Sequence, residues 1–134
     1  NTVGTIDGSI SWTDGPYVAA GGTSWTSSSD ENLKNITGEI DDALNKVTQL
    51  RAAKFTWKAD TENTPQVGLI AQDLQNVLPE CVVVPDEKND SQGNPKFLGV
   101  NYDQVIPLLV AAIKELKAEL DATKAEVQAL KGVK

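Results

Sequence analysis

Residues 103–131 of the chain read DQVIPLLVAAIKELKAELDATKAEVQALK. The apolar residues of this stretch recur at alternating intervals of three and four, which is the heptad spacing of a helix that packs along a narrow seam against other helices. We call the positions of this heptad the apolar stripe; they are Ile106, Leu109, Ile113, Leu116, Leu120, Thr123, Val127 and Leu130. At about 1.5 Å per residue, the heptads extend over about 42 Å. A stripe this long and narrow predicts a C-terminal helix that associates with other helices.

Charged residues flank the apolar stripe in a regular way. Glu119 and Glu126 fall at heptad position g, and Lys124 and Lys131 fall at the following position e. This arrangement pairs parallel chains in register, so it favours parallel self-association. The stripe alone does not count the strands, because its a positions mix Ile, Leu and Val and Thr123 weakens one layer. An amphipathic helix lying on its own domain remains the alternative.

The centre of the chain alternates between helical and strand-like patterns. Apolar residues at helical spacing predict a helix over roughly 38–50, with a short helical entry before it. The alternation around Phe55 and Trp57 predicts a half-buried strand with Trp57 in the core, and 67–70 reads as a second strand after a turn. The fold class expected here is α+β.

The second half of this centre predicts one more helix and one more hairpin. A short amphipathic pattern covers 71–78, and Pro79 ends it. The β-branched run 81–84 and the returning stretch 97–102 flank a polar loop, which indicates a hairpin. Cys81, beside three valines, is expected to be a small buried apolar residue.

Three segments follow from these patterns. Residues 1–28 are dense in Gly, Ser and Thr and read as β-structure that continues something upstream. Residues 29–102 form the expected α+β core, and 103–134 form the expected coiled-coil helix. A single domain of this size leaves little core to spare, so partner chains could supply the missing burial.

Composition excludes several function classes. Lys and Arg total 12 against 19 Asp and Glu, and a net charge of −7 disfavours partners such as nucleic acid and anionic lipid. No stretch approaches the roughly 20 apolar residues of a membrane span, and residues 1–28 lack the pattern of a signal peptide, so we expect a soluble chain. The absence of His excludes Ser-His-Asp catalysis. The acidic loop at Asp86, Asn89 and Asp90 reads as a solvated hairpin tip, so no metal or cofactor is expected.

The composition leaves one hydrolytic pair, a serine nucleophile with a lysine base. Ser29 and Lys34 lie five residues apart where loop-like sequence meets helical sequence. On one continuous helix their side chains would point about 140° apart, so Ser29 must precede the helix or Lys34 must act on a neighbouring chain. An ordinary helix cap at Ser29 and Asp30 with a solvated lysine is the simpler alternative.

A set of short motifs in order along the chain resembles a known family. The motifs are Ser29-Asp30 with Leu33-Lys34, Phe55 with Trp57, Gly68 to Leu74, Leu78-Pro79-Glu80, and Tyr102 to Leu109, followed by the heptad. Together they resemble the C-terminal intramolecular chaperone domain of phage tail spikes and tail fibres, the S74 family of self-cleaving peptidases. The match covers residues 29–131.

The resemblance implies a homotrimeric chaperone that brings three fibre chains into register and folds with the upstream fibre domain of the same polypeptide. A Ser29–Lys34 dyad would then cut the backbone beside the serine, with Ser28 and Asp30 flanking the cleavage site. The family further implies a precursor of a virion tail fibre or tail spike, used in host attachment, that assembles in the bacterial cytoplasm and releases the chaperone fragment.

Two choices remain open at this point. The Ser29 hydroxyl reaches the carbonyl of Ser28 through a five-membered ring, whereas cleavage after Ser29 would need another subunit. A trimerisation cap without proteolysis accounts for the heptad equally well, and a related self-cleaving segment of a membrane-bound animal transcription factor is a more distant alternative.

Overall fold

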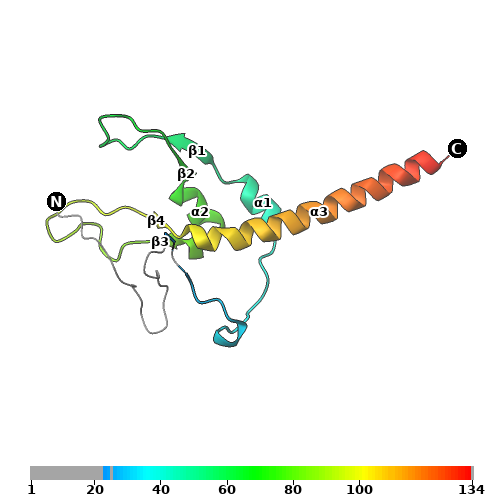
Figure 1. Ribbon diagram of the computed structural model, residues 1–134, viewed down its shortest axis with the longest axis horizontal. Helices are drawn as coiled ribbons and strands as arrows, with labels where there is room; N and C mark the ends of the chain where they lie inside the picture. Colours follow the sequence, from blue (N-terminus) through cyan, green and yellow to red (C-terminus); the bar gives the residue numbers. More distant parts are fainter. Residues whose placement is uncertain (1–22, 25, 134) are drawn as a thin grey trace. The chain divides into compact units, whose positions relative to one another are not determined.

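The computed structural model describes residues 23–24 and 26–133, and the chain divides into two compact units, Asn1–Gly38 and Glu39–Lys134. Most of the β-structure predicted for 1–28 lies outside the described residues. In the described part of the first unit, one 3-10 helix forms, η1 (Glu31–Leu33). It is the short blue helical turn in Figure 1.

The second unit combines two small antiparallel hairpins with helices. Its elements are, in chain order, α1 (Ala43–Thr48), β1 (Ala52–Phe55), β2 (Gln66–Leu69), α2 (Ala71–Val77), η2 (Pro79–Cys81), β3 (Val82–Val83), β4 (Gly99–Val100) and α3 (Tyr102–Gly132). Figure 1 shows α1 and α2 beside the first half of α3, with the rest of α3 extending beyond them. The expected α+β class is confirmed.

Each hairpin joins neighbours in the sequence. β1 pairs with β2 so that Ala52 lies opposite Leu69, and β3 pairs with β4 so that Val82 lies opposite Val100. The carboxylate of Asp60 accepts hydrogen bonds from the backbone N–H groups of Glu62 and Thr64 at 2.9 and 2.8 Å. This side-chain turn closes the β1–β2 hairpin where the sequence predicted a turn.

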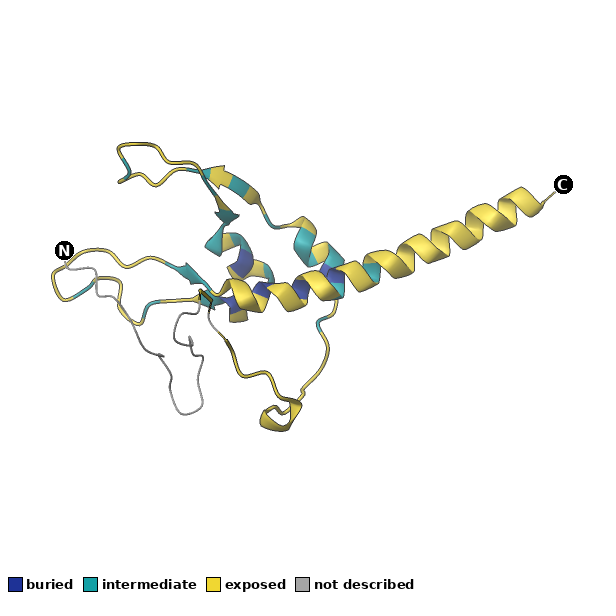
Figure 2. Cartoon of the chain, in the orientation of Figure 1, coloured by how far each residue is buried: buried dark blue, intermediate teal, exposed yellow. Residues whose placement is uncertain are grey.

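The core of the second unit is small and lies under the start of α3. Two buried clusters form it: Ala43, Leu108 and Ala112 in one, and Leu74, Cys81 and Val105 in the other. Full burial of Cys81 agrees with its expected role as an apolar residue. Figure 2 shows that the buried residues of α3 are confined to its first half, while the remainder is exposed. Within residues 23–24 and 26–133, most of the long helix is therefore left without a packing partner.

The helix predicted over 38–50 was too long. α1 begins only at Ala43, because Asp42 adopts a left-handed backbone conformation (φ 50°) that breaks helical geometry before it. Ile40 still packs against the core from the non-helical segment, whereas Ile36 is 68% exposed. Some of the apolar residues in this segment do pack on the core, but Ile40, which lies before Ala43, does so without being in a helix.

The placement of Trp57 in the core was also wrong. β1 ends at Phe55, and Trp57 stands at the beginning of the turn that leads to Asp60, where its backbone carbonyl accepts from the Asp60 N–H at 3.0 Å. The indole is 64% exposed and packs edge-on against the ring of Phe55, with centroids 5.0 Å apart. Because the strand ends at Phe55, the alternation of inward and outward side chains does not extend to Trp57.

Gly68 in β2 lies where neighbouring side chains leave no room for a Cβ. A Cβ at this position would lie 2.7 Å from the hydroxyl oxygen of Tyr102 and 3.3 Å from the ring of Phe55. The same hydroxyl accepts a hydrogen bond from the Leu69 N–H at 2.8 Å. The first turn of α3 is thereby attached to β2.

Within the part of the chain that the structure describes, none of the helices combines the length and the apolar character that a membrane span requires.

Candidate active site

Ser29 and Lys34 meet across the η1 turn. Asp30 is the N-cap of η1 in an extended conformation (φ −65°, ψ 133°), and Lys34 follows the turn in an extended conformation (φ −122°, ψ 137°). The Leu33 and Lys34 N–H groups donate to the carbonyls of Asp30 and Glu31 at 3.1 and 3.0 Å. One tight turn therefore reverses the chain enough to bring the side chain of Lys34 back to Ser29.

The Lys34 amine makes two hydrogen bonds to one residue. Its Nζ donates to the hydroxyl oxygen of Ser29 at 2.7 Å and to the carbonyl oxygen of Ser29 at 3.2 Å. The geometric obstacle raised by the sequence is removed, because Ser29 precedes the helical turn and does not share a helix with Lys34. A nucleophile and a base in direct contact within one chain are the first requirement of a serine-lysine dyad. The catalytic role of both residues stays a prediction.

Solvent reaches both members of this pair. Ser29 and Lys34 are exposed, and the apolar side chains of Leu33 and Ile36 beside them are 74% and 68% exposed. A lysine acts as a base only in its uncharged form, which burial favours and water opposes. The single chain thus provides the contact between Lys34 and Ser29, and burial of the Lys34 amine would have to come from a partner that covers it.

The acid next to the serine is held by its own turn. The Asp30 carboxylate oxygen Oδ1 accepts from the backbone N–H and from the side-chain amide of Asn32, both at 2.8 Å. These hydrogen bonds, first the backbone one, hold the pKa of Asp30 below its usual range, and the Lys34 charge adds a smaller effect in the same direction. Asn32 was not among the site residues predicted from the sequence, although an Asp side chain is known to accept from the backbone N–H two residues further on.

Ser27 and Ser28, the other serines near the motif, make no hydrogen bond to Lys34 among the residues that the structure describes. Ser28 contributes the carbonyl that precedes the candidate nucleophile. The structure thus brings Ser29, Asp30 and Lys34 together in one turn.

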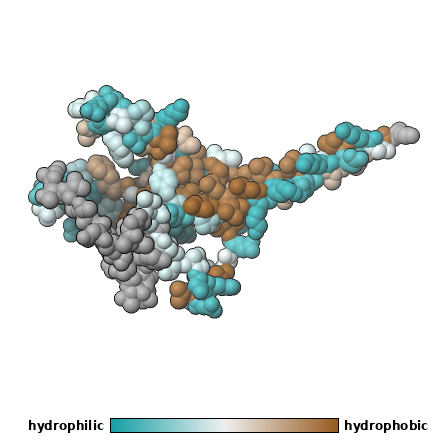
Figure 3. Space-filling view, in the orientation of Figure 1, coloured by the Kyte–Doolittle hydropathy of each residue, from teal (hydrophilic) through white to brown (hydrophobic). Residues whose placement is uncertain are grey.

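The apolar stripe of α3 is exposed along its whole length. The exposed fractions of its apolar members are Ile106 57%, Leu109 42%, Ile113 66%, Leu116 52%, Leu120 46%, Val127 44% and Leu130 75%. The residues of α3 that pack on the chain's own core are Val105, Leu108 and Ala112, on a neighbouring face of the helix. Figure 3 shows hydrophobic surface over the first half of α3 and mixed surface toward its end. The interface role of the stripe remains a prediction.

The acidic hairpin tip has a local structural explanation. Asp90 accepts hydrogen bonds from the backbone of Gln92 and Asn94 and from the Asn94 side chain, at distances of 2.9 to 3.0 Å. These contacts use the carboxylate to close its own turn. Within residues 23–24 and 26–133, no cluster of His, Cys, Asp and Glu is arranged to hold a metal ion.

A comparison with known protein families matches the segment that carries Ser29 and Lys34. Residues 29–83 match the model of the Peptidase S74 family, described as the chaperone of endosialidase. This segment belongs to that family, which confirms the resemblance inferred from the motifs.

Similar sequences occur in phage proteins. The chain is 39% identical over 95 residues to the Long tail fiber protein Gp37 of Enterobacteria phage K3, and equally to that of Enterobacteria phage T2. The alignment covers 69% of this chain and 7% of each relative. The chain therefore spans only a small part of the length of these curated relatives.

Proposed function

We propose that this chain is the chaperone segment of a phage tail fibre, which promotes trimerisation and folding of the fibre and then releases itself by cutting its own backbone. The family of residues 29–83 and the tail fibre relatives support the chaperone role. The observation that carries the cleavage is the 2.7 Å contact between the Lys34 amine and the Ser29 hydroxyl.

The proposed reaction starts with an uncharged Lys34 amine. The amine takes the Ser29 hydroxyl proton while Oγ bonds to the carbonyl carbon of Ser28, which is reachable through a five-membered ring. The Ser28–Ser29 C–N bond then breaks, and the departing nitrogen takes a proton from the Lys34 ammonium. Water hydrolyses the resulting ester, which frees the Ser28 carboxylate and restores the Ser29 hydroxyl.

A second scissile bond is favoured by the other contact of the amine. Nζ donates to the Ser29 carbonyl oxygen at 3.2 Å. This contact would polarise that carbonyl and favour attack on its carbon, which would break the Ser29–Asp30 peptide bond. The Ser29 hydroxyl cannot attack its own carbonyl without forming a four-membered ring. This route therefore needs the hydroxyl of a neighbouring copy.

Assembly through α3 would switch the reaction on. In this proposal, three copies pack their apolar stripes into a parallel coiled coil, with Glu119 and Lys124 of neighbouring copies paired at its edge. The neighbouring copies also cover the exposed Leu33 and Ile36, and so exclude water from the Lys34 amine between them. Cleavage then waits until the chains are in register.

Each of the three proposed segments has its own role. Residues 1–28 would be the end of the fibre, 29–102 the chaperone and protease core, and 103–134 the trimerising helix. The precursor would assemble in the bacterial host, and the fibre would enter the virion after the released fragment leaves.

The decisive experiment is mass spectrometry of the chain expressed whole, compared with Ser29→Ala and Lys34→Ala. Fragments 1–28 and 29–134 are expected from the wild type if the Ser28 carbonyl is attacked, and 1–29 and 30–134 if the neighbouring copy acts. Both variants should stay intact, whereas the matched controls Ser28→Ala and Lys58→Ala should still be cut.

The alternative function is a trimerisation cap that never cleaves. Exposure of the Ser29–Lys34 pair in the single chain favours this alternative, because water surrounds the proposed base. It predicts an intact wild-type chain that still forms trimers, which would overturn the proposed cleavage while leaving the chaperone role.

A further inference from the structure

A carboxylate beside a catalytic lysine poses an electrostatic problem. An opposite charge within a few ångströms favours the charged form of an amine, and the charged form cannot accept the serine proton. The charged side chains in the described segment 26–38 are Asp30, Glu31 and Lys34. The dyad therefore needs its own acidic neighbours turned away from the amine.

Asn32 holds the carboxylate of Asp30 by two hydrogen bonds. The same carboxylate oxygen of Asp30 receives both the backbone N–H and the side-chain amide of Asn32 at 2.8 Å. The ion pairs formed among residues 26–133 include neither Asp30 nor Glu31 with Lys34. The amine donates to Ser29 instead, at its hydroxyl and its carbonyl.

We infer that Asn32 is a positioning residue of the dyad, whose side-chain amide keeps the Asp30 carboxylate in the cap of η1 and away from the Lys34 amine. The inference rests on the proposed autoproteolysis. The lowered pKa of Asp30, caused first by its hydrogen bonds from Asn32, agrees with a carboxylate that is charged and engaged in the cap.

The backbone and the side chain of Asn32 each make their own hydrogen bond to Asp30, so a substitution can remove the side-chain bond and keep the backbone bond. In Asn32→Ala the backbone N–H of residue 32 still donates to the Asp30 carboxylate that caps η1, so the turn that joins Ser29 to Lys34 is retained. Loss of the amide bond removes one of the two contacts that hold the Asp30 carboxylate in the cap, so the carboxylate turns toward the amine for a larger part of the time. The effect should therefore appear in the pH dependence and should vanish when the charge of Asp30 is removed as well.

The test measures the cleavage rate of the whole chain against pH for the wild type, Asn32→Ala, Asp30→Asn with Asn32→Ala, and the matched control Asn35→Ala. Asn32→Ala should raise the pH of half-maximal cleavage, with the rate at neutral pH falling about tenfold for each unit of that rise. The double variant and the control should keep the wild-type midpoint.

A second readout does not depend on cleavage. The titration of Lys34, followed by NMR of its side chain in the uncut Ser29→Ala background, should move to higher pH on Asn32→Ala and return on adding Asp30→Asn. An unchanged midpoint in Asn32→Ala would overturn the inference while a cut wild type leaves the proposed function intact. A double variant as slow as Asn32→Ala would also overturn it, because the turn and not the charge would then be responsible. A wild type that is never cut overturns the proposed function, and the positioning role with it.

Discussion

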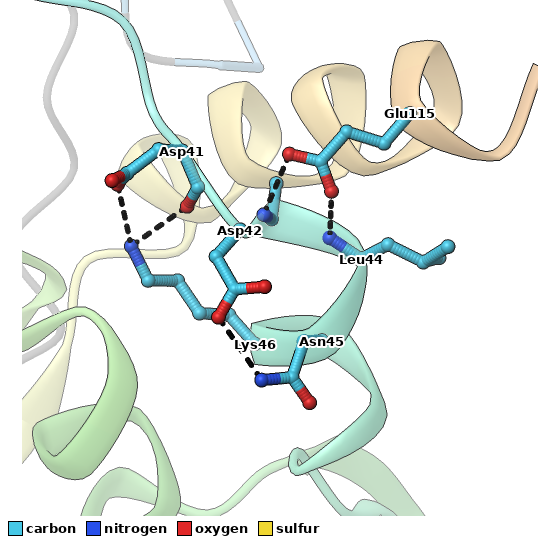
Figure 4. Close-up of polar contacts among 7 residues, drawn as sticks. Asp41, Asp42, Leu44, Asn45, Lys46 and Glu115 are labelled. Carbon is cyan, nitrogen blue, oxygen red and sulfur yellow. Dashed lines mark hydrogen bonds and ion pairs between the residues drawn. The ribbon is translucent and has the colours of Figure 1, made fainter. Parts of the chain in front are cut away.

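The carboxylate of Glu115, in the middle of α3, caps the N-terminus of α1 by accepting the Leu44 N–H at 2.7 Å. Its other oxygen accepts the Ala43 N–H at 2.9 Å, so one side chain satisfies two of the free donors at the helix start. The N-cap residue itself, Asp42, makes no capping hydrogen bond and bonds to the Asn45 side chain instead (Figure 4). A contact across 71 residues of sequence thus replaces the usual local cap.

Glu115→Ala should lower the free energy of unfolding by about 1–2 kcal/mol, because it leaves two helix N–H groups without their acceptor. Urea unfolding at a fixed protein concentration measures the loss. The exposed neighbour Lys114→Ala is the control and should change the free energy by less than about 0.5 kcal/mol. Equal effects of the two substitutions would show that the capping bonds contribute nothing.

Gly68→Ala should destabilise the second unit by about 1–3 kcal/mol, because the added Cβ would lie 2.7 Å from the Tyr102 hydroxyl. Tyr102→Phe removes that oxygen, so the combination with Gly68→Ala should cost less than the sum of the two single changes. Thermal unfolding of the four proteins measures the coupling. Gly132→Ala, where a Cβ meets nothing within 4 Å, should be harmless.

The Arg51–Asp73 pair should make stability depend on pH in acid. Arg51 donates to both carboxylate oxygens of Asp73 at 2.8 and 2.9 Å, and this hydrogen bonding lowers the pKa of Asp73. A lowered folded-state pKa stabilises the fold above the unfolded value of 3.8 and loses that stabilisation as pH falls through the folded pKa.

The stability gap between the wild type and Asp73→Asn should therefore be largest near neutral pH and should narrow below about pH 4. Arg51→Gln should show the same narrowing gap, and the double variant should add little to either single one. Denaturant unfolding at a series of pH values measures the gap. A gap that is constant from neutral to strongly acidic pH would contradict the linkage.

Lys34→Arg separates a base from a simple hydrogen-bond donor. The guanidinium keeps the positive charge and the donors but stays protonated at any ordinary pH, so the variant should fold and associate normally and fail to cut. A denaturing gel and sedimentation velocity report the two properties. Cleavage at the wild-type rate would rule out proton transfer to position 34.

Leu116→Asp tests whether assembly gates cleavage. A charge buried in the seam of the apolar stripe should dissociate the copies and leave the chain whole. Lys114→Asp introduces the same side chain away from the stripe and should affect neither association nor cutting. Cleavage at normal speed in monomeric Leu116→Asp would refute the coupling.

Much of this protein followed from local sequence patterns. The heptad predicted α3, because a side-chain period repeated along one helix is independent of what surrounds it. Both hairpins and the short helix before Pro79 were also predicted, since their turn and breaker residues act on adjacent backbone. The spacing of Ser29 and Lys34 indicated the candidate site, and the turn at Asp30 then met the geometric condition that the sequence had set.

Tertiary structure decided what those patterns could not express. The first N–H groups of α1 donate to Glu115, far away in sequence, and Trp57 is exposed because its strand ends before reaching it. Likewise, sequence periodicity marked the apolar stripe, but the packing of Val105, Leu108 and Ala112 decided which face of α3 the chain uses for itself. Periodicity is a property of one segment, whereas burial and long-range hydrogen bonds depend on which segments meet.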